Sequence, residues 1–140
     1  MYKDYNMAAM QVALFCRLNM NRKTNIPIRY SEMGALIYIA VSEQPVSPAM
    51  ISTFLGITKP SATAILKILD TNGYIERSPS KQDKRSYTVL LTEKGQDLAD
   101  KARAEYCKAI ELVHKKLGEE DFVQLISLIS QANSILKNHE

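Results

Sequence analysis

The sequence predicts a mainly α-helical fold that contains one small β-hairpin. Through most of the 140 residues, apolar side chains recur at the three- and four-residue spacing of amphipathic helices. Between residues 74 and 91, this spacing gives way to two short runs of β-forming residues on either side of a polar loop. The length, with 46% hydrophobic and 24% charged residues, indicates a single folded domain over residues 1–140.

The first two helices are expected over residues 4–23 and 30–43. An apolar stripe defines the first helix, which breaks near Pro27. The second helix ends before Pro45, because proline cannot continue the hydrogen-bond ladder of a helix. The stripe of the first helix is Met7, Met10, Leu14 and Leu18, and the inward face of the second is Met33, Leu36, Ile37 and Ala40.

A closely spaced pair of helices follows, over residues 48–55 and 59–71. Ser47 and Thr58 are suited to cap their N-termini, and Pro48 fits a first helical turn. Gly56 can adopt the left-handed conformation that ends the earlier helix. Two helices joined by a short turn with glycine are typical of a helix-turn-helix. The buried stripe of the later helix is Ala62, Ile65, Leu66 and Leu69.

The remaining chain predicts a hairpin and two more helices. Residues 74–78 and 86–91 are the expected strands, and Thr92 caps a long helix over residues 93–117 that ends at Gly118. The last helix is apolar almost all round, with Leu128 and Ile135 outside its main stripe. Such a helix needs a wide core stripe or a partner subunit. We favour the partner, because a short chain offers few internal neighbours.

A helix-turn-helix followed by a hairpin predicts a winged helix that binds duplex DNA. In this motif the second helix enters the major groove, and the hairpin, or wing, can reach a neighbouring minor groove. Short hydroxyl and basic side chains suit phosphates and base edges. The predicted DNA-binding residues are Thr58, Lys59, Ser61, Thr63 and Lys67 on the helix, and Lys81, Lys84 and Arg85 on the wing.

Two parts of the sequence resemble the MarR family, the multiple-antibiotic-resistance regulators. Residues 51–77, ISTFLGITKPSATAILKILDTNGYIER, resemble its helix-turn-helix. Residues 83–86, DKRS, and 91–95, LTEKG, resemble its wing and the start of its next helix. The resemblance implies a winged-helix homodimer. Residues 30–92 would form the DNA-binding lobe, and residues 1–25 and 93–140 the helical dimerisation region.

The resemblance also implies roles for individual residues. Arg85 would enter the minor groove, and Asp83 would stabilise the wing by pairing with a nearby arginine, either Arg77 or Arg85 itself. The family often has arginine, a guanine-reading or phosphate-binding group, where this chain has Ala64, so the target DNA sequence does not follow from the resemblance. Family members usually bind a small aromatic or phenolic effector. The residues that would line its pocket, and would otherwise be ordinary core, are Met10, Leu14, Met33, Ile37 and Tyr38.

These features predict a ligand-responsive repressor that acts as a homodimer on a pseudo-palindromic operator. The alternative is a dimeric interaction or ligand-sequestering protein that keeps the winged fold without binding DNA. No nucleophile–base pair, glycine-rich phosphate loop or paired carboxylate site is recognisable, so we expect no catalysis, no cofactor and no metal. The absence of a long apolar run and of a secretion signal favours a cytoplasmic protein without a membrane partner.

Cys16 is a further candidate, because some relatives sense oxidants through a cysteine in the first helix. Arg17 beside it could lower the pKa of its thiol. The alternative is packing as a small apolar side chain, which is the usual role of a free cysteine.

Overall fold

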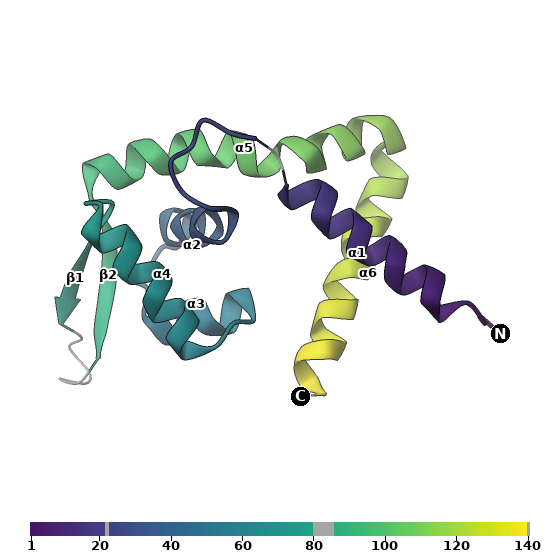
Figure 1. Cartoon of the computed structure of the whole chain (residues 1–140), viewed down its shortest axis with the longest axis horizontal. Coiled ribbons are helices and arrows are strands. Elements are labelled where there is room, and N and C mark those ends of the chain that lie inside the picture. Colours follow the sequence, from purple (N-terminus) through teal and green to yellow (C-terminus); the bar gives the residue numbers. More distant parts are fainter. Residues whose placement is uncertain (22, 80–85, 140) are drawn as a thin grey trace.

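The computed structural model describes residues 1–21, 23–79 and 86–139. Within them the chain forms six helices and one antiparallel hairpin, which confirms the predicted fold class (Figure 1). The elements are α1 (Tyr5–Met20), α2 (Tyr30–Val41), α3 (Pro48–Leu55), α4 (Lys59–Thr71), β1 (Ile75–Pro79), β2 (Tyr87–Leu91), α5 (Glu93–Leu117) and α6 (Glu119–Asn138).

The helix ends follow local capping chemistry. The side chains of Ser47 and Thr58 accept hydrogen bonds from the N–H groups of Met50 and Ser61, both at 3.2 Å. Gly56 ends α3 in the left-handed conformation, with φ of 66°. As a result, the predicted ranges of α3, α4 and α5 agree with the structure to the residue.

Several other boundaries differ from the prediction. Helix α1 ends at Met20 instead of residue 23, and α2 ends at Val41 instead of residue 43. Ser42 explains the early end of α2, because its backbone is extended and its hydroxyl donates to the Tyr38 carbonyl at 2.6 Å. Both strands begin one residue later than expected, at Ile75 and Tyr87.

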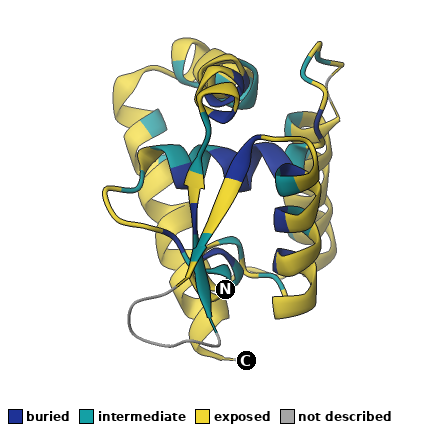
Figure 2. Ribbon diagram, turned by 90° about the vertical axis from the view of Figure 1, so that its left-hand side faces the viewer, coloured by how far each residue is buried: buried dark blue, intermediate teal, exposed yellow. Residues whose placement is uncertain are grey.

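A single core holds α2, α3, α4, the hairpin and the first half of α5 together. Its fully buried large side chains are Leu36, Val46, Ile51, Leu66, Leu69 and Val89. The predicted stripes of α2 and α4 contribute to it, but Ala35 and Ile39 of α2 are also buried. Helix α2 is enclosed on more than one face because it contacts both α5 and the α3–α4 pair. In Figure 2 the buried residues gather around the hairpin and the helices packed on it.

The start of α5 lies very close to the turn between α4 and β1. Thr92 donates its hydroxyl to the Gly73 carbonyl at 2.6 Å, and its N–H bonds the Tyr74 carbonyl at 3.1 Å. A Cβ atom on Gly95 would lie 1.9 Å from the carbonyl oxygen of Tyr74. The glycine of the LTEKG segment therefore permits this close approach.

Helices α1 and α6 lie away from this core, at the other end of α5 (Figure 1). Neither helix contains a buried residue. Both expose large apolar side chains: Met7, Met10, Val12, Leu14, Leu18 and Met20 on α1, and Val123, Ile126, Leu128, Ile129, Ile135 and Leu136 on α6. The apolar excess of α6 thus finds no core within its own chain.

Among the described residues, no single helix has the length and apolar character needed to cross a membrane. Only α3 and α4 taken together meet that test, and the chain bends by 115° between them.

Candidate nucleic-acid interface

The first turns of α4 carry the predicted polar side chains on one exposed face. Ala62, Leu66 and Leu69 point into the core, and the opposite side of the helix is exposed. The exposed predicted residues are Thr58, Lys59, Ser61, Thr63 and Lys67, and Ala64 is exposed beside them. The structure therefore brings the predicted helix residues together on the solvent side of α4.

Hydrogen bonds hold the start of α4 in one arrangement. The Thr58 hydroxyl accepts from the Ser61 N–H and donates to the Ser61 hydroxyl at 2.9 Å. In the turn before it, the Ser52 hydroxyl donates to the Ile57 carbonyl at 2.6 Å, and the Ile57 N–H bonds the Ser52 carbonyl at 3.0 Å. The 115° bend between α3 and α4 falls in the range of helix-turn-helix motifs. Thus α3 braces α4, whose polar face remains open.

The hairpin lies beside α4 and has an unbroken register from Ile75 opposite Leu91 to Pro79 opposite Tyr87. Val46 extends this small sheet through an isolated bridge, in which the Val89 N–H bonds the Val46 carbonyl at 2.8 Å. The predicted wing-tip residues Lys81, Asp83, Lys84 and Arg85 lie outside the described residues.

Arg77 of β1 contacts both α4 and β2. Its Nε lies 3.1 Å from a carboxylate oxygen of Asp70, on the last turn of α4. Its guanidinium also lies over the ring of Tyr87, 4.6 Å from the centroid. The sequence reasoning selected Arg77 as a wing residue but missed Asp70. An acidic residue at the end of α4, seven positions before an arginine on the next strand, was the available signal.

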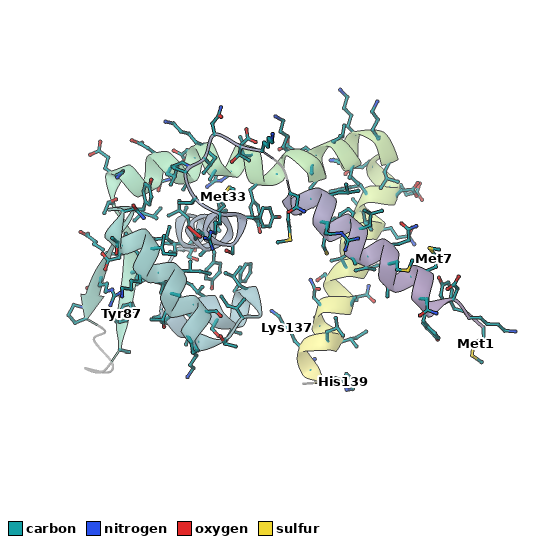
Figure 3. All side chains as sticks on the ribbon, in the orientation of Figure 1. Met1, Met7, Met33, Tyr87, Lys137 and His139 are labelled. Carbon is teal, nitrogen blue, oxygen red and sulfur yellow. The ribbon has the colours of Figure 1, made fainter. Side chains whose placement is uncertain are left out.

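The five residues predicted to line an effector pocket do not line one common cavity. Met33 lines a cavity of about 140 Å³, and Tyr38 lines a separate hollow. Ile37 is half-buried, while Met10 and Leu14 are exposed on α1. Figure 3 shows Met33 on α2 within the lobe. The complete lining of the smaller cavity is Asn19, Met20, Thr24, Ile28, Arg29, Tyr30, Met33, Glu105 and Tyr106.

Two tyrosines, Tyr30 and Tyr106, form part of the wall of this smaller cavity. The rings of Tyr30 and Tyr106 stack at 4.6 Å, and the Asn19 amide donates to the Tyr30 hydroxyl at 2.8 Å. Burial, reinforced by the neighbouring Tyr106 hydroxyl, raises the pKa of Tyr30 to about 12. The sequence did not predict Asn19, Tyr30 and Tyr106 as cavity residues, because they are far apart along the chain and no local pattern indicates that they are in contact.

The second hollow has a volume of about 430 Å³ and lies between α3 and the end of α6. Tyr38 and Phe54 stack there at 4.3 Å. The Lys137 ammonium donates to the Thr53 carbonyl at 3.2 Å, and in Figure 3 it extends from α6 toward the lobe. This bond is a direct link between the C-terminal helix and the helix-turn-helix.

Neither cysteine forms a disulfide within the described part of the chain. Cys16 is exposed on α1, and Cys107 is half-buried on α5. Among the same residues, no three His, Cys, Asp or Glu side chains cluster closely enough to hold a metal ion.

Comparison with known proteins finds matches in sequence and in fold. Residues 26–86 match the sequence profile of the MarR family. The regulator PapX from Escherichia coli is 28% identical over 106 residues, which cover 64% of this chain and 65% of PapX. The chain therefore spans just under two thirds of that relative.

Solved structures match over nearly the whole chain. A MarR/EmrR family regulator from Acinetobacter sp. ADP1 superimposes with a TM-score of 0.82 at 22% identity, covering 98% of this chain and 99% of that one. MepR from S. aureus, in its complex with DNA, superimposes with a TM-score of 0.79 at 19% identity, covering 96% and 98%. The arrangement of all six helices and the hairpin is therefore the one seen in these regulators.

Proposed function

We propose that this chain, whose residues 26–86 match the MarR family of transcriptional regulators, is a member of that family and binds operator DNA as a homodimer through α4 and the β1–β2 wing. One observation carries the proposal: a braced helix exposes a polar face that includes Lys59, Ser61 and Thr63, with a hairpin directly beside it. That combination suits a major groove and the backbone next to it. MepR, which shares this fold, has been solved in complex with DNA, and this supports DNA binding by the present chain.

The apolar faces of α1 and α6 support the homodimer. Leu128, Ile135 and Leu136 expose 55%, 59% and 67% of their surfaces in the single chain. Apolar patches of this kind on a small protein mark an interaction surface. A two-fold partner that covers them would present two α4 helices to one duplex, and the successive major grooves of a pseudo-palindromic site lie about 34–36 Å apart.

The proposal includes repression that a small aromatic or phenolic effector relieves. The cavity beside Tyr30 and Tyr106 lies between α1, α2 and α5, where the lobe joins the dimer helices. A ligand with greater affinity for one lobe orientation would change the population of DNA-competent dimers. Regulation of this kind operates on the chromosome, so we expect the protein to act in the cytoplasm.

The test is a gel-shift titration with duplexes that the wild-type protein selects from a random-sequence pool. We expect a preferred duplex, affinity that falls as salt rises, and Arg85→Ala binding weaker by about 1 kcal/mol or more. Lys108→Ala on α5, away from α4 and the wing, is the matched control for the loss of one positive charge. If no duplex is preferred at any salt concentration, the interaction or ligand-sequestering alternative replaces this proposal.

A further inference from the structure

We propose that Asp70 is a positioning residue for DNA recognition, which holds the wing at a set angle to the recognition helix through Arg77. The proposal rests on the proposed function, since it assumes that α4 and the wing contact one duplex. It concerns residues that would not themselves need to touch DNA. Three elements meet at this point: the last turn of α4, β1 and β2.

Strand parity places Arg77 on the inner face of the hairpin. Arg77 stands directly opposite Val89, which is completely buried, and Ile75 on the same face is also buried. The inner face is thus apolar near α5 and becomes polar at Arg77, toward the end of the hairpin. At this position on β1 the Arg77–Asp70 pair joins the strand to the last turn of α4.

The guanidinium of Arg77 is constrained from two sides. Its Nε bonds Asp70 at 3.1 Å, and the Tyr87 ring lies 4.6 Å away on the other strand. A planar guanidinium satisfies both contacts at once, whereas a lysine ammonium cannot present the same flat face. Pro79 and Tyr87 form the last pair of the register. Arg77 therefore lies two residues before the end of β1.

The exposure of the pair argues for a geometric role over a stabilising one. The side chains of Arg77 and Asp70 are 42% and 40% exposed. Ion pairs as exposed as this contribute little to the free energy of folding. Loss of Asp70 should therefore leave the fold intact while it frees the outer half of the hairpin. Recognition groups need supporting contacts of this kind to hold their positions within about 0.5 Å.

Electrostatics and positioning make opposite predictions for Asp70→Asn. Removal of a negative charge near the interface should strengthen binding to any duplex through the phosphate backbone. Release of the wing should weaken binding to the preferred duplex specifically. Glu76→Gln is a matched control, because Glu76 precedes Arg77 on β1, is exposed and points to the opposite face of the hairpin.

The experiment titrates wild type, Asp70→Asn, Arg77→Lys and Glu76→Gln against the duplex selected by wild type and against an unselected duplex, at one salt concentration. We expect Asp70→Asn and Arg77→Lys to lose about five-fold or more in affinity for the selected duplex only. Glu76→Gln should bind equally or more tightly. Hydroxyl-radical footprints of the first two variants should lose protection at the flanks and keep it at the centre.

Thermal melts separate positioning from unfolding, because both variants should melt close to the wild type. The assignment is overturned if Asp70→Asn binds the selected duplex as tightly as wild type with an unchanged footprint, or if its loss of affinity follows a large loss of stability. A wild-type protein that selects no duplex overturns the proposed function and this assignment together. The two failures are therefore distinguishable.

Discussion

Gly95→Ala tests the close approach of α5 to the α4–β1 turn. The added Cβ would lie 1.9 Å from the Tyr74 carbonyl oxygen and 2.8 Å from its carbon. Ordinary contacts begin at 3.4 Å, so α5 or the turn must move by roughly 1.5 Å. The hydrogen bonds of Thr92 to the Gly73 and Tyr74 carbonyls, at 2.6 and 3.1 Å, would be strained by that movement.

The expected loss of stability is about 2–4 kcal/mol. Alanine is favoured over glycine in a helix interior by about 1 kcal/mol, and a backbone collision of this depth outweighs that gain. For a chain of this size, the melting temperature should fall by roughly 8–15 °C. Urea and thermal unfolding at one protein concentration measure the change, since the proposed dimerisation would make stability depend on protein concentration.

Gly34→Ala is the matched comparison. Its Cβ would meet the Tyr106 hydroxyl at 3.2 Å, and a side-chain end can move where a backbone carbonyl cannot. We expect a loss of at most about 1 kcal/mol there. A Gly95→Ala protein as stable as wild type, or more stable, would refute the close approach at the start of α5.

Three further predictions address the proposed dimer, the start of α4 and the cavity beside Tyr30. Ile135→Glu places a charge on the apolar face of α6, where the Ile135 side chain is 59% exposed in the single chain. Sedimentation velocity should show dimerisation weakened about tenfold or more. An unchanged dimer would place the interface elsewhere. Thr58→Ala removes the N-cap of α4 and should lower the free energy of unfolding by about 1 kcal/mol in urea unfolding. Thr58→Ser keeps the hydroxyl and should retain most of that stability. Equal losses in the two variants would contradict the capping role. The pKa of Tyr30 is raised from 10.0 to about 12, so above pH 10 the unfolded chain loses this proton before the folded one does. Stability should therefore fall as pH rises from about 10 to 12, and Tyr30→Phe should make that fall smaller in urea unfolding at several pH values; an identical pH dependence in both proteins would refute the raised pKa.

The sequence allowed the helix-turn-helix to be predicted closely because its boundaries depend on local interactions. Ser47 and Thr58 cap helices within three residues of themselves, and Gly56 ends α3 through its own backbone conformation. Spacing alone predicted the buried Ala62, Leu66 and Leu69 of α4, whereas the fourth predicted residue, Ile65, is half-buried. The full set of buried residues on α2 could not be predicted from spacing, since a helix enclosed on several faces has no single apolar stripe.

The candidate site divides in the same way. The amino-acid sequence by itself determined which side chains of α4 are exposed and that a hairpin follows, because helix and strand periods assign faces residue by residue. Only the tertiary structure decided that Arg77 meets Asp70 and Tyr87, and that Asn19 and Tyr106 meet Tyr30. These contacts join separate elements, and their geometry depends on how the whole core packs. Local preferences carry no information about that packing.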